Sequence, residues 1–253
     1  MVSVSRRAKE TEQPRGGYIP LREFETIQPD DGIELNLDEN IHGSLVGMAV
    51  DYLTRVNLGT DPESVFFASM RGAEIINETD EAKELLDEVK GIDNQSIINA
   101  CKLSGYDVCY RIGPRDYRPV EEINPDEDTI ENIRTMVKRG VTFFEEHGPV
   151  VLDGFTFEGA YTDIVTVGDG DFLTESTLWD FKVVKSKPNK NHTLQLFIYY
   201  LMGLRSKHKT KFEKLDSIGL FNPRLNIIYL LKIENISKDL MDEVSKKVIG
   251  YSD

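Results

Sequence analysis

Cysteine and long apolar runs are scarce in this sequence, and each scarcity excludes a class of protein. Only two of the 253 residues are cysteine, Cys101 and Cys109. Because they lack C-x-x-C spacing and have no histidine nearby in the sequence, we expect neither a disulfide scaffold nor a zinc module, and a reducing compartment fits the chain. The longest apolar run, 196–204, is too short to span a bilayer. No apolar stretch follows the early Arg6 and Arg7, so we expect no signal peptide, no membrane partner and a cytoplasmic protein.

Basic residues are outnumbered as well. The chain has 30 Lys and Arg against 44 Asp and Glu, a formal net charge of −14. This balance argues against a non-specific nucleic-acid coat protein, which is usually basic. The basic residues are unevenly spread, because the segment 182–214 contains nine of them and a single acid, Glu213. A solvated helix face is the ordinary explanation of such a cluster, and phosphate binding is the alternative.

The order of hydrophobic patterns predicts a mixed α/β protein. Residues 1–35 are polar and contain several Gly and Pro, which predicts a partly disordered arm. Residues 36–148 show helical periodicity, and we expect them to pack on a core formed by 149–253 in one compact domain. The predicted helices there cover about 41–56, 64–76, 79–91, 94–105 and 127–148.

From residue 149 onward the pattern changes to β-branched and aromatic residues that alternate with polar ones. It predicts strands at about 150–157, 160–167, 173–184, 216–223 and 225–233, and helices at about 190–206 and from Ser237. Asp169 and Asp171 flank a glycine, and we assign both to a turn between strands rather than to a metal site. We therefore expect a mixed central sheet flanked by helices.

One short stretch combines a carboxylate and a lysine on an apolar strand. In "LWDFKV", 178–183, side chains alternate between faces, so Asp180 and Lys182 share one face while Trp179 lies on the other. Asp163, on the preceding predicted strand, could then lie beside Asp180. Two adjacent carboxylates repel each other, and a divalent cation such as Mg²⁺ or Mn²⁺ removes the conflict. With a lysine to orient water, this group has the minimum equipment for metal-dependent phosphodiester hydrolysis.

The pattern D/E-x-K is not specific on its own, since it occurs three times. The matches at 81–83 and 88–90 lie on a predicted polar helix, where residues i and i+2 point in different directions. Only the match at 180–182 lies on an apolar strand. Ordinary roles stay open even there: Asp180 and Lys182 could form a plain ion pair, Gln195 could bond a buried backbone group, and Tyr199 could be a core residue.

Taken together, the motifs resemble the core of the PD-(D/E)XK nuclease superfamily. "YTD" precedes "LWDFKV" as an acid on one strand precedes D/E-x-K on the next in that family, and "QLFIYY" resembles the Q-x-x-x-Y motif of its RecB-type exonuclease branch. The similarity covers about 150–235. It implies the following roles: Asp163 and Asp180 bind the metal with the backbone carbonyl of Phe181, Lys182 positions the nucleophilic water, and Gln195 and Tyr199 support the site and contact substrate.

The resemblance also gives the basic segment a role. Lys185 and Lys187 follow the catalytic strand and would lie at the mouth of the site, where a phosphate backbone passes. The basic residues at 205–211 end the next helix, where cations also suit the helix dipole without any DNA.

The chain departs from the family pattern at an upstream helix. RecB-type nucleases carry approximately G-x-x-x-H-x-x-x-E there, whereas "GSLVGMAVD" places Gly43, then Gly47 where histidine is expected, then Asp51. His42 is out of register, so Asp51 is the one candidate for a further metal ligand, and it could equally be on the polar side of its helix. Two cysteines cannot supply the four-cysteine iron–sulfur cluster of some relatives.

The function implied by the resemblance is hydrolysis of DNA by a Mg²⁺- or Mn²⁺-dependent nuclease, with an exonuclease acting on single strands or duplex ends as the first expectation. Repair, phage replication and defence are settings that fit, and an acidic nuclease without a helicase motif could receive its DNA from a protein partner. The competing interpretation is a degenerate nuclease fold that serves as an acidic protein-binding or inhibitor module.

Overall fold

Polar side chains next to the first turns fix where the longer helices begin. The computed structural model describes residues 2–252. Helix α2 (Gly43–Asn57) starts after His42, whose ring accepts a hydrogen bond from the Ser44 N–H. Helix α6 (Asn94–Arg111) starts after Asp93, whose carboxylate accepts from two backbone N–H groups of the first turn. Such caps satisfy donors that have no partner within the helix.

The described residues form ten α-helices and six strands. The remaining helices are α1 (Val4–Glu10), α3 (Pro62–Val65), α4 (Phe67–Ile75), α5 (Thr79–Asp87), α7 (Glu127–His147), α8 (Lys190–Gly203), α9 (Lys209–Phe212) and α10 (Lys238–Val244). The strands are β1 (Glu25–Ile27), β2 (Val150–Thr156), β3 (Asp169–Thr174), β4 (Thr177–Phe181), β5 (Ser217–Asn222) and β6 (Ile227–Lys232).

All six strands belong to one mixed open sheet with the order β1-β6-β5-β4-β3-β2. Strands β4 and β5 are parallel, and α8 lies in the crossover between them; the other neighbours are antiparallel. Parallel neighbours need such a crossover connection, whereas β3 and β4 are joined by a tight turn. The predicted α/β class, with a mixed sheet flanked by helices, is confirmed.

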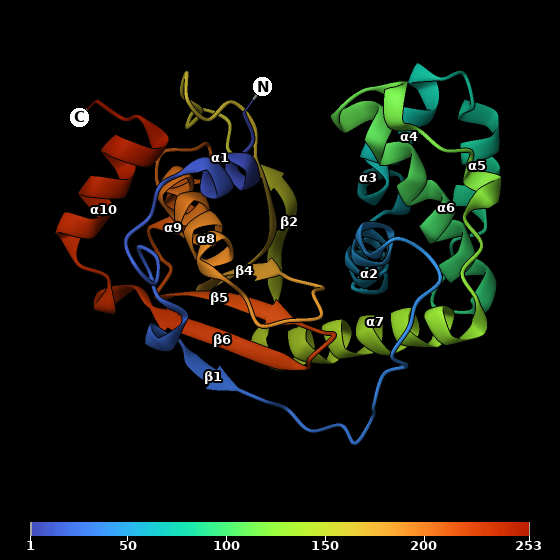
Figure 1. Ribbon diagram of the computed structural model, residues 1–253, viewed down its shortest axis with the longest axis horizontal. Helices are drawn as coiled ribbons and strands as arrows, with labels where there is room; N and C mark the ends of the chain where they lie inside the picture. The colour runs from blue at the N-terminus through green and yellow to red at the C-terminus, as the bar shows by residue number, and fades with distance from the viewer. Residues whose placement is uncertain (1, 253) are drawn as a thin grey trace. The chain divides into compact units, whose positions relative to one another are not determined.

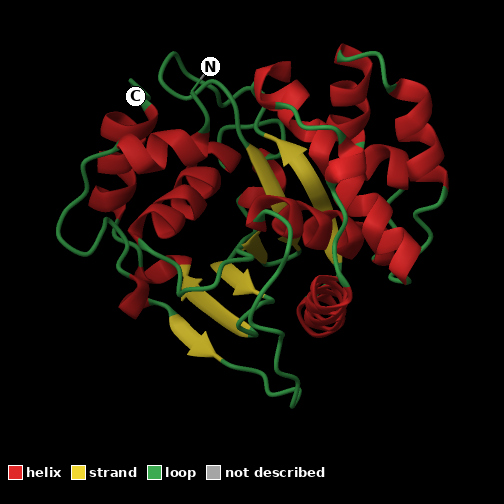
Figure 2. Ribbon diagram, turned by 45° about the vertical axis from the view of Figure 1, so that its right-hand side comes forward, coloured by secondary structure: helices red, strands yellow, loops and turns green. Residues whose placement is uncertain are grey.

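The chain divides into two compact units. One, which we call the sheet unit, consists of 1–30 and 146–253, and the other, the helical unit, is the continuous segment 31–145. Every strand, drawn yellow in Figure 2, belongs to the sheet unit, and the helical unit contains only helices and connecting segments. Among residues 2–252, no helix has the length and apolar character needed to cross a membrane.

Residues 2–30 are structured, which corrects our expectation of a partly disordered polar arm. In α1, Val4 and Ala8 are buried in the core that α8 also occupies, and Figure 1 shows the two helices next to each other. Strand β1 pairs with β6, where Ile27 lies opposite Ile228. The polar composition is therefore that of a segment with one buried stripe and an exposed edge strand.

The core of the sheet unit lies between α8 and one face of the sheet. Leu178 of β4 and Leu220 of β5 pack in it together with Phe197 of α8. The opposite face carries large aromatic side chains, among them Trp179, whose ring occupies the space above Gly219. A Cβ at Gly219 would lie 2.1 Å from a ring carbon of Trp179, so only glycine fits there.

The helical unit is held by a close approach of α4 and α6 and by a buried carboxylate. Gly72 allows the approach, since a Cβ there would lie 2.0 Å from the carbonyl oxygen of Tyr106. The neighbouring Asp107 is 1% exposed and accepts hydrogen bonds from the hydroxyls of Tyr52 at 2.5 Å and Ser69 at 2.6 Å. With Arg111 at 3.1 Å, the buried charge is fully surrounded by donors.

Several predicted elements differ from the structure. The predicted strand 173–184 covers the end of β3 and all of β4, and the predicted helix 64–76 covers the end of α3 and all of α4. The segment 160–167 is not a strand, although one isolated bridge joins Val167 to Ser3. Its alternating pattern arises because Val165 is buried in the core while Thr162 bonds nearby backbone groups. Helix α6 also continues to Arg111 instead of ending at Gly105, where the side chain of Ile123 occupies the space that a Cβ would need.

Candidate active site

Two carboxylates lie opposite each other on neighbouring strands of the sheet. The antiparallel register pairs Phe172 of β3 with Trp179 of β4, which places Asp171 across from Asp180. The backbone N–H of Phe181 donates to Oδ2 of Asp171 at 2.8 Å. Directly opposed residues point to the same face of a sheet, so both acids lie on the face that α8 covers.

Asp171 thus occupies the place that the sequence analysis gave to Asp163. Asp163 is exposed and lies in a bend, outside every strand. The residue before it, Thr162, ties this bend to the C-terminal part of the chain by donating to the carbonyl of Ile249 at 2.6 Å. Asp163 is therefore not on the strand next to Asp180, and the assignment of Asp171 to a turn was wrong.

A signal for Asp171 was present in the sequence. The residue directly precedes the apolar pair Phe172 and Leu173, which the pattern could have extended backwards into a strand. Gly170 hid this, because glycine flanked by acids is typical of turns. In the structure Gly170 is inside β3, where the ring of Phe155 lies 2.4 Å from the position of a Cβ.

Asp180 and Lys182 form a close ion pair at the end of β4. The ammonium Nζ of Lys182 lies 2.6 Å from Oδ2 of Asp180, whose side chain is completely buried, while that of Lys182 is 14% exposed. A buried carboxylate beside a second carboxylate is costly without a positive charge. Lys182 supplies that charge. Its ammonium group is partly accessible to solvent and lies next to the two acids.

Helix α8 adds a buried polar pair to the same region. Gln195 donates from Nε2 to the hydroxyl of Tyr199 at 3.0 Å, one helical turn away. The Tyr199 ring stacks on Phe157 with centroids 5.1 Å apart. Burial, together with the charges of Asp180 and Asp171, holds the pKa of Tyr199 well above its usual value. Tyr199 is therefore a neutral phenol near the acids, and α8 brings the Gln195–Tyr199 pair to the same side of the sheet as Asp180 and Lys182.

The two halves of the basic segment differ in their surroundings. Lys185 and Lys187 are exposed in the loop between β4 and α8. In the second half, Lys207 pairs with Glu158 at 3.0 Å, and the guanidinium of Arg205 lies 4.1 Å from the ring centroid of Tyr251. Local partners thus engage Arg205 and Lys207 without any nucleic acid.

The tentative ligand Asp51 belongs to the helical unit. Its Oδ2 lies 2.6 Å from the guanidinium of Arg55, one turn further along α2. The ion pair is mostly buried, which fits the ordinary role of a helix residue with an i,i+4 partner. The group on the sheet is therefore described without Asp51.

The donor set fits a hard divalent cation. Within 2–252 no group of three or more His, Cys, Asp and Glu side chains is arranged to hold a metal ion. Mg²⁺, however, is commonly held by one or two carboxylates, with waters and substrate phosphates as the remaining ligands. Asp171 and Asp180 provide two such carboxylates on adjacent strands, and Phe181 provides a backbone carbonyl directly after Asp180.

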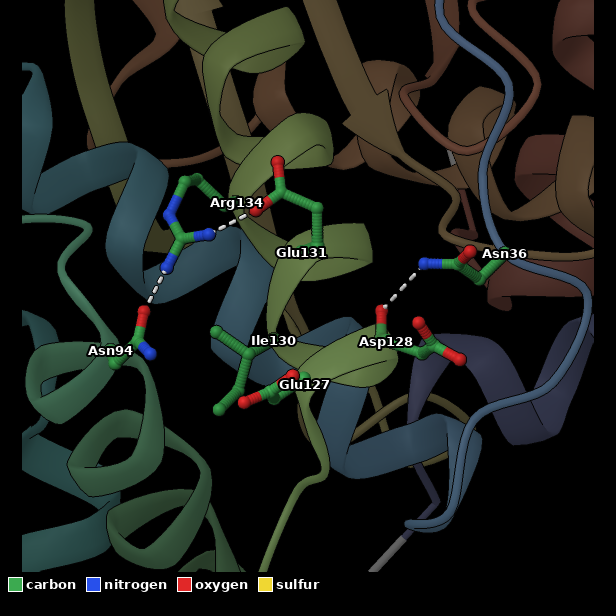
Figure 3. Close-up of a pocket in the computed structure, with 7 residues that line it drawn as sticks. All are labelled: Asn36, Asn94, Glu127, Asp128, Ile130, Glu131 and Arg134. Atoms are coloured by element: carbon green, nitrogen blue, oxygen red, sulfur yellow. Dashed lines mark hydrogen bonds and ion pairs between the residues drawn. The ribbon is translucent and has the colours of Figure 1, made fainter.

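A surface pocket in the helical unit has different chemistry. It is lined by Asn36, Asn94, Glu127, Asp128, Ile130, Glu131 and Arg134 (Figure 3). The guanidinium of Arg134 bonds Glu131 and Asn94, and it donates to the carbonyl of Ile92 at 2.9 Å. Because the Arg134 guanidinium is already bonded to these neighbours, this pocket is a weaker candidate for a functional site than the group on the sheet.

Comparison of the chain with models of protein families, with curated proteins and with solved structures found no match in any of the three. The case for a function therefore rests on the residues of the site.

Proposed function

We propose that this protein is a Mg²⁺- or Mn²⁺-dependent nuclease that hydrolyses phosphodiester bonds in DNA. The observation that carries the proposal is the arrangement of Asp171, Asp180 and Lys182 on one face of two neighbouring strands. Two opposed carboxylates can bind a divalent cation, and a lysine in contact with them can bind a phosphate oxygen. Burying two carboxylates is costly unless positive charge compensates them.

The order of elements around the site supports the resemblance to PD-(D/E)XK nucleases. An acid on β3 precedes the D-x-K sequence on β4, and α8 with Gln195 and Tyr199 then crosses to the parallel strand β5. Asp171 takes the role that we expected for Asp163, and the remaining motif residues keep theirs. The exonuclease branch, with single strands or duplex ends as substrates, remains part of the proposal because the Gln195–Tyr199 pair supports it.

Each residue has a defined task in the proposed reaction. Asp171 and Asp180, with the Phe181 carbonyl, would hold the cation, which when bound would stabilise negative charge on the phosphate oxygens. Lys182 would orient a water molecule for attack on phosphorus; the water adds as one P–O bond breaks, giving a phosphomonoester and an alcohol. Gln195 and Tyr199 would keep the site in position, and Lys185 and Lys187 would contact the incoming backbone.

The test compares matched substitutions on linear and circular DNA with Mg²⁺ or Mn²⁺. We expect D171N, D180N and K182A to lower the rate by at least about hundredfold, because each removes a charge that acts in the transition state. D163N is the control and should cleave like the wild type. An exonuclease should leave closed circles intact. If D163N were inactive while D171N cleaved normally, the assignment of the site would be wrong.

A second candidate is a non-catalytic module built on the same fold. The observation that favours it is that Asp180 already has a counter-charge in Lys182, so its own charge does not require a metal cation. Absence of cleavage of single- and double-stranded DNA or RNA with either metal would support this candidate. The nuclease predicts metal-dependent cleavage, to which a protein partner could deliver DNA in repair, phage replication or defence.

A further inference from the structure

His192 lies in the first turn of α8, three residues before Gln195 and seven before Tyr199, which puts it on the same face of the helix, and it has no role assigned so far. His192 occupies the third position of the helix, and its Nδ1 accepts a hydrogen bond from the Asn189 N–H at 3.2 Å. An accepting Nδ1 leaves the proton of a neutral imidazole on Nε2. Among residues 2–252 no acceptor is bonded to that Nε2–H, so this donor is available to a ligand.

The N-terminal segment brings a second cationic side chain to the same helix turn. Helix α1 is anchored by Val4 and Ala8, and Lys9 is on its exposed side. The chain then continues along α8, where Gln13 donates to the side chain of Asn191 at 3.0 Å. Gly17 packs so closely that a Cβ would lie 2.9 Å from Cβ of Lys190.

Gln13 also donates to the carbonyl of Ala8 at 3.5 Å, so the residue just before Lys9 is tied through one side chain to the first turn of α8. Burial, and then the charges of Lys182 and Lys9, lower the pKa of His192 to about 4. The ring is therefore neutral at neutral pH and serves as a hydrogen-bond donor, while the two ammonium groups supply the charge. No acid pairs with Lys9 within the described part of the chain, whereas Lys182 is paired with Asp180, so Lys9 and the His192 N–H are the groups in this region that are left to bind an anion.

We propose that His192 and Lys9 form a phosphate subsite beside Lys182, which holds the phosphodiester adjacent to the one that is cleaved. This inference rests on the proposed nuclease function. Phosphate oxygens suit the site because a neutral N–H donor and a mobile ammonium can bind one anion together without a third fixed charge. The backbone N–H groups of the helix end are not the binding element, because the Asn189 side chain already accepts from those of Asn191 and His192.

The competing explanation is that His192 only caps the helix, and three substitutions separate the two roles. H192Q keeps both an acceptor for Asn189 and a donor. H192E keeps the acceptor, since glutamate is a usual capping residue at this position, but it has no donor and adds a negative charge. H192A loses both. Thermal unfolding of each variant gives the capping contribution separately from activity.

The subsite predicts a pattern in the kinetics of the full chain on single-stranded DNA. We expect H192E and H192A to raise KM about tenfold while kcat changes little, because a hydrogen bond to a charged group is lost. H192Q should stay within about twofold of the wild type. K9M should raise KM and reduce the slope of log affinity against log salt by about 0.7, since one phosphate contact is removed.

A matched lysine provides the control for charge. Lys83 is exposed on α5 of the helical unit, and K83M changes the net charge by the same amount as K9M. K83M should leave KM unchanged. If H192E cleaved with the KM and kcat of the wild type, or if K9M and K83M behaved alike, the subsite would be overturned while the nuclease function stood.

Failure of the nuclease function gives a different result. If the wild type cleaved nothing, binding of a fluorescent single-stranded oligonucleotide in EDTA would replace KM as the measurement. Weaker binding by H192E and K9M than by H192Q and K83M would then support the phosphate subsite. Equal affinities for all four variants would overturn it.

Discussion

Two aspartates that are equally buried have opposite surroundings. Asp107 accepts hydrogen bonds from two hydroxyls and an arginine, so its charge is fully compensated and its role is to fix packing in the helical unit. Asp180 instead lies across from a second acid, Asp171, and beside Lys182. Burial alone therefore does not distinguish a structural aspartate from one in a candidate site, whereas the charges and donors around each aspartate do.

The sequence identified Asp180 and Lys182 but not Asp171, and the reason is physical. A D-x-K sequence within an apolar strand predicts that its acid and its lysine lie together, because alternation fixes which side chains share a face. The partner acid depends on strand register, which is set by contacts far apart in the chain. Gly170 made its segment resemble a turn, although the space required for the Phe155 ring explains that glycine.

Acid should destabilise the protein partly through His192. The pKa of His192 is lowered from 6.5 to about 4 by burial and by its lysine neighbours, so the unfolded chain takes up a proton below about pH 6.5 and the folded chain does not. The stability that His192 contributes is therefore present above pH 6.5 and is lost as the pH falls towards 4. H192Q removes this loss.

The check is denaturant unfolding of the wild type and H192Q at several pH values. The difference in free energy of unfolding should shift in favour of H192Q between about pH 6.5 and 4, and it should be constant above pH 7. His147 and His208 also have lowered pKa values, but both are present in both proteins and cancel in the comparison. A difference that does not change with pH would contradict the assignment.

At the scale of elements, most helices and the strands β5 and β6 were predictable, whereas the division between β3 and β4 and the longer connections were not. Helices α5 and α7 follow strong periodicity, and β5 and β6 are apolar runs with a turn between them. The segment 160–167 has strand-like alternation, yet its backbone groups bond the N-terminal segment and Thr162. An alternating pattern indicates which side chains are buried, but it does not indicate whether a neighbouring strand pairs with the segment.

The contact between α4 and α6 should depend on a single glycine. We expect G72A to lower the free energy of unfolding by about 2 kcal/mol or more, because the new methyl group would meet the Tyr106 carbonyl, which is backbone and cannot rotate away. The measurement is chemical denaturation followed by circular dichroism.

G43A is the matched control for this substitution. A Cβ at Gly43, at the start of α2, would have nothing within 4 Å. The free energy of unfolding of G43A should be unchanged or raised by up to about 1 kcal/mol, because alanine favours the helix more than glycine does. Equal effects of the two substitutions would show that helix propensity, and not the close approach, determines the role of Gly72.

At the scale of the whole molecule, the negative charge is concentrated in one unit. Segment 31–145 contains 24 acidic and 11 basic residues, whereas the rest of the chain contains 20 and 19. The sheet unit, with the proposed site, is nearly neutral. The acidity of the chain as a whole therefore does not count against phosphate binding on the sheet unit, and the helical unit is the part that should repel nucleic acid.

The helical unit should fold when it is expressed alone. It is one continuous segment with its own buried network around Asp107, and helices α2 to α6 pack on one another within it. We expect residues 31–145 to give a helical circular dichroism spectrum and a cooperative thermal transition, which G72A shifts to lower temperature. A fragment that is unfolded or melts without cooperativity would show that the unit needs the rest of the chain.

The pairing of β1 with β6 has a consequence for the order of synthesis. Ile27 lies opposite Ile228, and α1 packs on α8, so the first 30 residues have their partners near the other end of the chain. A ribosome that adds about 5–20 residues per second needs roughly 10–40 s to make the segment between them. During that time the helical unit can already fold, while Val4, Ala8 and the edge of β1 remain exposed because their partners have not been made. The segment with α1 and β1 is therefore the part of this protein for which a chaperone would matter most during synthesis.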